Sequence, residues 1–350
     1  MHEELFRYRR QMVLAGFGET GQRRLLASHA IVVGMGALGC VSADLLVRAG
    51  VGRVTLIDRD LVEASNLQRQ TLYSEEDARD GLPKAEAAAA RLRRVNSEIE
   101  IEPIVADVTP ANAEHLLTRG TVILDGTDNF EARYLINDVC VEHRLTLAYA
   151  GVVGTRFMQS TFTPGAGCLR CLFEEPPDVG HGQTCDVVGV LGPAVSFAAA
   201  AQAADVIGLL AGIGTLVPGR LLEGGLWPLR TRVLDVSRAM GRSDCPCCGL
   251  GRRDFLRGPR SQDAATLCGQ DVVQISPTRA GSLDLTALAA RLASEGDVRA
   301  GRFFVRVTSR HRTPEVGTLE ITIFADGRAL VRGTSRPDVA RAMYARLVGS

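Results

Sequence analysis

A glycine-rich turn that could bind a ligand lies between a short apolar run and a helix-like segment. This turn contains Gly34, Gly36 and Gly39, and a second apolar run ends in Asp58. In such a pattern the first glycine permits a tight turn, the second lets the backbone approach a ligand, and the third lets the helix pack closely on the strand. The helix start would bind phosphate through its N–H groups, and Asp58 would accept a hydrogen bond from a ribose hydroxyl. The pattern predicts a nucleotide pocket, for which a nicotinamide (NAD) enzyme is the usual default.

Two Cys-x-x-Cys pairs lie far apart in the chain, Cys168 with Cys171 and Cys245 with Cys248. Four thiolates at this spacing predict a tetrahedral structural Zn²⁺ site that staples distant segments, with redox-active cysteines as the alternative. Cys247 offers a second pairing with less regular spacing. The odd total of nine cysteines also favours metal binding in a reducing compartment over disulfides.

Polar side chains follow the second and later strands. Asn66 and Arg69 come after the strand that ends at Asp58, where ligands bind in open α/β sheets. Lys84 begins a predicted helix over residues 83–94, and a cation there opposes the helix dipole. Unfavourable placements of this kind are where a functional role is worth suspecting. Asp128 lies in a strand-to-helix loop, where it could bind a ligand or merely cap the helix.

Composition limits the classes of partner. Lys plus Arg and Asp plus Glu number 40 each, so no overall basic field favours nucleic acid or an anionic membrane. The start of the chain is charged, unlike a signal peptide. The arginine cluster around Arg10 is, taken alone, typical of a solvated helix face. The apolar segment 188–213 is interrupted by Gly192 and Pro193 and is expected to be a buried helix. We therefore expect a soluble, cytoplasmic protein.

Strand and helix signals alternate through the first half of the chain and give way to strand-rich sequence. This order predicts an α/β fold, with a Rossmann-like, mostly parallel sheet and an antiparallel, zinc-stapled second half. We assign residues 1–250 to this domain, residues 251–263 to a linker and residues 264–350 to a small C-terminal α+β domain. In the last of these, Asp326-Gly327 between alternating runs predicts a hairpin.

Several motifs occur in the same order as in the ThiF/MoeB family, the bacterial relatives of the ubiquitin-activating enzymes. The resemblance spans roughly residues 5–250. It rests on the glycine turn, the two cysteine pairs and four further stretches: Arg7-Tyr8-x-Arg10-Gln11, Ser65-Asn66-Leu67-Gln68-Arg69-Gln70, Gly81-x-Pro83-Lys84 and Asp125-Gly126-Thr127-Asp128-Asn129. These motifs are specific in combination, far more so than the glycine turn alone.

The resemblance implies ATP rather than NAD. Family members adenylate the C-terminal Gly-Gly carboxylate of a small β-grasp sulfur-carrier protein. The acyl-adenylate then becomes a thiocarboxylate for thiamine, molybdopterin or other sulfur pathways, with a sulfur donor such as a cysteine desulfurase.

The resemblance also assigns roles to individual residues. By position, Asp58 matches the ribose-binding acid, and the residues around the triphosphate are Asn66, Arg69 and Lys84. Asp128 matches the aspartate that holds Mg²⁺. Arg10 matches an arginine given to the neighbouring subunit's ATP, which implies a homodimer.

Other features leave alternatives open. Cys185 matches a loop cysteine that joins the sulfur chemistry covalently in some members and is dispensable in others. Residues 264–350 do not resemble a rhodanese domain, and our hypothesis is that they recruit a carrier or sulfur donor. The competing functions are adenylation of a peptide C-terminus or a tRNA base, an NAD-dependent oxidoreductase, and a non-catalytic scaffold.

Overall fold

The computed structural model describes residues 3–177, 188–213, 217–258, 264–266, 272–275, 283–313 and 317–349. The chain divides into two compact units, Met1–Gly258 and Pro259–Ser350. Cys185 lies outside the described residues.

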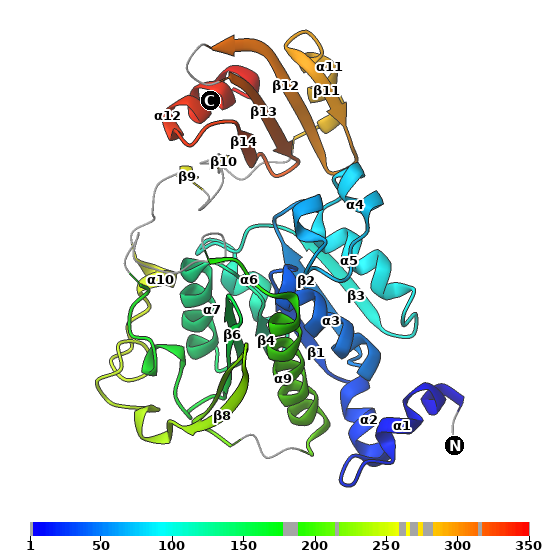
Figure 1. The fold of residues 1–350 in the computed structure, drawn as a ribbon, viewed down its shortest axis with the longest axis vertical. Coiled ribbons are helices and arrows are strands. Elements are labelled where there is room, and N and C mark those ends of the chain that lie inside the picture. Colours follow the sequence, from blue (N-terminus) through cyan, green and yellow to red (C-terminus); the bar gives the residue numbers. More distant parts are fainter. Residues whose placement is uncertain are drawn as a thin grey trace. The chain divides into compact units, whose positions relative to one another are not determined.

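The first unit consists of an eight-stranded sheet and its covering helices (Figure 1). In chain order its elements are η1 (Glu3–Tyr8), α1 (Arg9–Met12), α2 (Gly18–Leu26), β1 (His29–Val33), α3 (Ala37–Ala49), β2 (Arg53–Asp58), η2 (Ala64–Asn66), α4 (Glu75–Asp80), α5 (Lys84–Arg93), β3 (Glu100–Val105), α6 (Ala113–Leu117), β4 (Val122–Asp125), α7 (Phe130–Glu142), β5 (Thr146–Val153), β6 (Arg156–Phe162), η3 (Leu169–Cys171), α9 (Gly192–Ala211), β7 (Arg220–Leu226), β8 (Leu229–Asp235), η4 (Ser237–Ala239) and α10 (Asp254–Arg257). Helix α10 falls within the predicted linker, residues 251–263, and buries Leu256.

The order of the strands confirms the predicted fold class. It is β3-β2-β1-β4-β5-β6-β7-β8, with parallel pairing from β3 to β5 and antiparallel pairing from β5 to β8. The chain therefore builds outward from β1 in one direction and then, starting at β4, in the other. Ligands bind at such a switch point in open α/β sheets.

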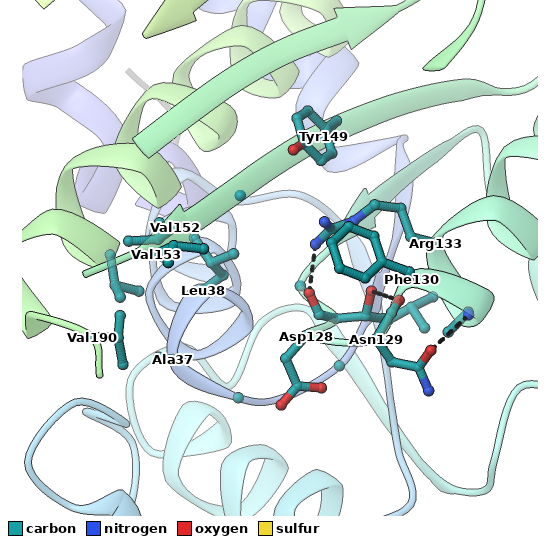
Figure 2. A pocket seen from close by; sticks show the side chains of 18 of the residues that line it. Ala37, Leu38, Asp128, Asn129, Phe130, Arg133, Tyr149, Val152, Val153 and Val190 are labelled. Carbon is teal, nitrogen blue, oxygen red and sulfur yellow. Dashed lines mark hydrogen bonds between the residues drawn. The ribbon is translucent and has the colours of Figure 1, made fainter. Parts of the chain in front are cut away.

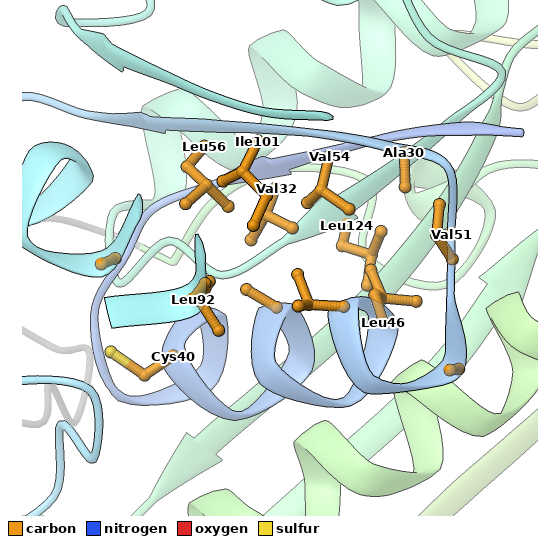
Figure 3. Packing of buried hydrophobic residues seen from close by; sticks show 14 of the residues in the cluster. Ala30, Val32, Cys40, Leu46, Val51, Val54, Leu56, Leu92, Ile101 and Leu124 are labelled. Atoms are coloured by element: carbon orange, nitrogen blue, oxygen red, sulfur yellow. The ribbon is translucent and has the colours of Figure 1, made fainter. Parts of the chain in front are cut away.

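Strands β1, β2 and β4 are buried on both faces, as expected for parallel strands joined by helical crossovers. Successive residues of β1 point to opposite faces. Val32 packs in a core with α3 and α5, whereas Ile31 and Val33 pack in a second core with α6 and α7. Figure 3 shows the first of these cores, in which Leu46 of α3 points at the side chains of the sheet.

In the glycine turn after β1, Gly34 and Gly39 have the structural roles expected from the sequence. Gly34 has φ +86°, and a Cβ there would lie 2.7 Å from the carbonyl oxygen of Gly126. A Cβ at Gly39 would overlap the carbonyl oxygen of Gly34. The turn and the close approach of α3 thus both require glycine.

Helix α9 is long and apolar enough to cross a membrane by length and composition alone, which is weak evidence of a span. Within the described part of the chain it behaves as a core helix. Its buried Gln202 donates hydrogen bonds to the carbonyl oxygens of Asp125 and Ala148. The prediction of a buried helix is only half right, because 44% of its apolar window is buried in the unit and Phe197 is 40% exposed.

In the part of the second unit that the structure describes, a six-stranded sheet and two helices share one apolar core. Its elements are β9 (Ala264–Thr266), β10 (Val272–Ile275), α11 (Leu285–Leu292), β11 (Gly296–Ala300), β12 (Phe304–Thr313), β13 (Gly317–Phe324), β14 (Ala329–Arg332) and α12 (Pro337–Leu347). The strand order is β11-β12-β13-β14-β10-β9. The predicted hairpin at Asp326-Gly327 joins β13 to β14, and Gly327 has φ +84°.

Candidate active site

A cavity of about 940 Å³ lies at the carboxyl ends of the parallel strands. The residues that follow β1, β2, β3 and β4 all contribute to its wall, as do residues of β5. Figure 2 shows that its two sides differ in character: Leu38, Val152, Val153 and Val190 gather on one side, and Asp128, Asn129 and Arg133 on the other. The sheet therefore places an apolar surface opposite a polar one at its switch point.

Six of the predicted site residues line this cavity: Gly34, Gly36, Asp58, Arg69, Lys84 and Asp128. Three others lie elsewhere in the described part of the chain. Gly39 packs beneath the turn, and the side chain of Asn66 accepts a hydrogen bond from Glu63 N. Arg10 is exposed on α1.

Asp58 is held at the end of β2 by two backbone donors. Its carboxylate accepts from the N–H groups of Met35 and Asp60, each at 2.6 Å. Burial raises the pKa of Asp58 to about 6, although the attraction of Lys84 acts in the opposite direction. A hydrogen bond thus connects the glycine turn directly to Asp58.

Lys84 begins α5 and is buried, with its Nζ 3.1 Å from a carboxylate oxygen of Asp60. Burial alone would lower the pKa of Lys84, but attraction to Asp60, Asp58 and Asp128 outweighs it and raises the pKa. The acids offset the unfavourable helix dipole noted from the sequence. Lys84 is also the one lysine of the chain, which has 39 arginines.

The loop between β4 and α7 shows which residue caps the helix. The side chain of Asn129, not that of Asp128, accepts a hydrogen bond from Ala132 N and caps α7. Asp128 is exposed at the cavity, and its carboxylate has no hydrogen-bond partner among the described residues. It is therefore available to a ligand or a cation.

Sequence reasoning missed several residues of the cavity wall. Asp60 is the direct partner of Lys84, and its place two residues beyond Asp58 could have suggested a role. Arg133 and Tyr149 also line the cavity. Their positions in a helix and in an apolar strand gave no local signal, because only the tertiary fold brings them to the site.

The four predicted zinc ligands meet in space. The sulfur atoms of Cys168, Cys171, Cys245 and Cys248 all lie within 4.8 Å of one another. The Sγ atoms of Cys168 and Cys245 are 3.7 Å apart, and those of Cys171 and Cys248 are 3.4 Å apart. A tetrahedral site with Zn–S bonds of about 2.3 Å has sulfur atoms about 3.8 Å apart, so these residues fit Zn²⁺.

Cys247 faces a different environment. Its buried Sγ is 3.3 Å from a carboxylate oxygen of Asp138 and 3.4 Å from the side-chain nitrogen of Asn137. Both partners belong to α7. Cys247 thus ties the second cysteine knuckle to the helix that follows the Asp128 loop.

The comparison with known families decides the assignment. The model of the ThiF family matches residues 8–247, well over half of the chain. The chain belongs to the ThiF family. This membership confirms the resemblance, and it does not support the nicotinamide-dependent oxidoreductase that the glycine turn alone would also fit.

Curated relatives of this ThiF-family chain include enzymes from three kinds of organism. The sulfur carrier protein ThiS adenylyltransferase of Bacillus subtilis is 38% identical, over 98% of this chain and 99% of its own length. The SAMP-activating enzyme E1 of Haloferax volcanii is 36% identical, over 72% of this chain and 92% of its own. The adenylyltransferase and sulfurtransferase MOCS3 of Bos taurus is 41% identical, over 71% of this chain and 54% of its own length.

Solved structures show the same fold at lower identity. Escherichia coli MccB is 22% identical with a TM-score of 0.58, over 67% of this ThiF-family chain and 69% of its own. PaaA is 23% identical with a TM-score of 0.56, over 67% and 74%. The relative from B. subtilis aligns with both units of the chain, whereas these structures match about two thirds of it.

Proposed function

We propose that the protein is an ATP-dependent adenylyltransferase that activates the C-terminal Gly-Gly carboxylate of a ubiquitin-like, β-grasp sulfur-carrier protein. The main support is one observation: a single cavity brings together the glycine turn, Lys84 and Asp128. Membership of the ThiF family and similarity to the B. subtilis ThiS adenylyltransferase over nearly the whole chain support the same reaction.

The chemistry explains the residue types. A carboxylate that attacks the α-phosphorus of ATP approaches a like charge, so the site must neutralise the phosphates and the charge that develops. Lys84 and Arg69 place cations in the cavity, and the free N–H groups at the start of α3 add a positive dipole. Asp58 would accept from the ribose.

Asp128 is the residue that we assign to Mg²⁺. Its exposed carboxylate suits a hard cation that prefers oxygen ligands. When bound, the metal would neutralise charge on the phosphates. The remaining cationic groups would then orient the triphosphate and exclude competing water.

The four cysteines would hold a structural Zn²⁺. They provide four thiolates and leave no open coordination position, which is typical of a structural rather than a catalytic site. The metal would join the segment after β6 to the segment after β8.

We further propose a homodimer. Arg10 is exposed and lies outside the residues that line the cavity of its own protomer, as a residue given to a partner's ATP would be. The half-exposed apolar face of α9, including Phe197, is a surface that a second copy could cover.

The proposal for the later sulfur step follows from the family resemblance, whereas the proposal for the second unit is motivated by its separate core. We propose that sulfur comes from a separate donor such as a cysteine desulfurase, that Cys185 is either a covalent participant or dispensable, and that the reaction takes place in the cytoplasm. We propose that residues 264–350 recruit the carrier or the donor. An unchanged Michaelis constant for the carrier after deletion of these residues would contradict carrier recruitment.

The decisive experiment is exchange of labelled pyrophosphate into ATP, with Mg²⁺ and a panel of Gly-Gly-ended carriers from the same organism. We expect exchange with one carrier, abolished in Asp128→Ala and kept in Asp235→Ala, which removes an exposed carboxylate of β8. No exchange with any carrier, from folded protein that still binds ATP, would favour adenylation of a peptide C-terminus or a tRNA base.

A further inference from the structure

Arg133 is a buried cation in the first turn of α7, and its guanidinium holds the preceding loop from two sides. Its Nε donates to a carboxylate oxygen of Asp125 at 2.7 Å, and a terminal nitrogen donates to the carbonyl oxygen of Thr127 at 2.8 Å. The side chain of Arg133 is 11% exposed and that of Asp125 is fully buried. One planar group therefore fixes both the end of β4 and the loop that follows it.

Asp125 completes a closed network around the loop. Its other carboxylate oxygen accepts from the backbone N–H of Thr127 at 2.9 Å and from the hydroxyl of Thr127 at 2.6 Å. Thr127 is thus held through its N–H, its hydroxyl and its carbonyl oxygen. Asp128 is the next residue, so the direction of its carboxylate depends on this network.

Two aromatic rings hold the guanidinium in place. Its carbon lies 5.0 Å from the ring centre of Tyr149 and 5.6 Å from that of Phe130. Figure 2 shows Arg133 between these rings, with Asp128 on the neighbouring loop. A planar guanidinium can stack on aromatic faces and donate in fixed directions at once, whereas an ammonium group cannot.

Burial alone would lower the pKa of Arg133, but attraction to Asp125, with a smaller contribution from Asp128, keeps it raised. The guanidinium therefore remains charged. Because its hydrogen bonds go to the loop, it acts on the site through Asp128.

We propose that Arg133 is a positioning residue, which aims the Asp128 carboxylate at a divalent cation in the cavity by clamping Asp125 and Thr127. This inference rests on the proposed function in one respect, the assignment of a metal to Asp128. It predicts that the network around Asp125 sets the affinity for the metal without contacting the metal itself.

The test measures metal binding directly. Mn²⁺ serves as the probe, with a non-hydrolysable ATP analogue, and the free ion is followed by electron paramagnetic resonance below the unfolding temperature of every variant. Arg133→Lys keeps the charge and removes the fork, and we expect the dissociation constant of Mn²⁺ to rise about tenfold, as for other partners that orient a metal ligand. Thr127→Val removes only one hydroxyl, and we expect a smaller rise.

Arg220→Lys is the matched control. Arg220 pairs with Asp205 at 2.6 Å, and that carboxylate also accepts from Gln159 and Thr161, yet none of these four residues lines the cavity. We expect Arg220→Lys to lower the unfolding temperature and to leave the Mn²⁺ dissociation constant unchanged. A purely structural role for Arg133 would produce the same pattern in Arg133→Lys.

Two results would overturn the inference. Arg133 is not a positioning residue if Thr127→Val and a folded Arg133→Lys both bind Mn²⁺ as tightly as the wild type while Asp128→Asn binds it weakly. If Arg133→Lys does not fold, Thr127→Val decides alone. If Asp128→Asn also binds Mn²⁺ normally, the metal assignment in the proposed function fails together with the inference.

Discussion

Lys84 shows how a single side chain can be fixed by its surroundings. Elsewhere the chain uses arginine for every cation of this kind, yet this position beside Asp60 has a lysine. A compact ammonium group with three rotatable donors fits a buried site next to a phosphate, and a rigid guanidinium fork is much larger. The size and shape of the lysine side chain therefore matter at this site, in addition to its charge.

This reasoning predicts the effect of Lys84→Arg. We expect the rate of pyrophosphate exchange to fall about 100-fold, equivalent to about 2.7 kcal/mol of transition-state stabilisation, although the charge is kept. Steady-state kinetics of the exchange measure the effect. The control is Arg91→Lys on the exposed side of the same helix, which should exchange at the wild-type rate. Wild-type kinetics in Lys84→Arg would show that only the charge matters.

Asp58 predicts a pH dependence of ATP binding. Burial raises its pKa to about 6, so the carboxylate becomes protonated as the pH falls through that value. A protonated acid accepts less well from a ribose hydroxyl, and the affinity for ATP should therefore decrease below about pH 6 and be constant above about pH 7. Calorimetric titration of ATP between pH 5 and pH 8 measures this, and Asp58→Asn should remove the dependence.

The sequence revealed those site residues that stand in local patterns. Gly34, Gly36 and Asp58 follow a recognisable spacing, and Lys84 was suspected because it opposes a helix dipole. Asp60 and Arg133 were missed because their roles depend on partners that the chain brings together from a distance. A charged residue in a helix has the same local appearance whether it is solvated or buried.

At the level of elements, α7 connects the cavity of the first unit with its four-cysteine cluster. Its N-terminal end is capped by Asn129 beside the cavity, and one side of its middle is bonded to the cysteine knuckles. Asn137 accepts from Leu169 N at 2.9 Å, and Asp138 accepts from Phe255 N at 3.0 Å. The four-cysteine cluster and the Asp128 loop are therefore joined by one helix.

We expect loss of zinc to destabilise the first unit in particular. Structural zinc sites supply on the order of 10 kcal/mol in small domains, and without the metal the four cysteines, three of them buried, would lose the ion that joins them. Cys248→Ser, or treatment with a chelator, should lower the unfolding temperature of the first unit and weaken ATP binding through α7. The second unit has its own core and should unfold as before. Calorimetry combined with zinc analysis measures both transitions.

The existence and order of the main elements could be predicted, because glycine turns and apolar runs are local signals. The short strand β11 and the short helix α4 were not predicted. Strand β11 is mostly exposed and has no apolar alternation. Helix α4 is only six residues long, almost all of them charged, and none of its side chains is buried. Such elements owe their structure to pairing and capping and not to periodicity.

At the level of the whole molecule, a composite site predicts complementation between two inactive proteins. Arg10→Ala has an intact cavity and Asp128→Ala has an intact Arg10. If Arg10 acts on the partner's ATP, each mixed dimer contains one complete site and one doubly defective site. Random assortment makes half of the dimers mixed, so about one quarter of the wild-type exchange activity should return.

Mixing after dissociation and reassociation, followed by pyrophosphate exchange, tests this. Each variant mixed with itself is the control and should stay inactive. Failure to recover activity from dimers shown to exchange subunits would place Arg10 in its own protomer's site or outside the mechanism.

The single lysine also has a consequence for the fate of the product. An acyl-adenylate is a strong electrophile toward amines, and the ε-amine of a surface lysine is the usual nucleophile that would intercept it. In this chain the one such amine is buried beside Asp60, and its raised pKa keeps it protonated and without a lone pair to donate. The enzyme therefore presents no lysine on which it could attach the activated carrier to itself by an isopeptide bond, and the activated carboxylate would be preserved for the proposed sulfur transfer.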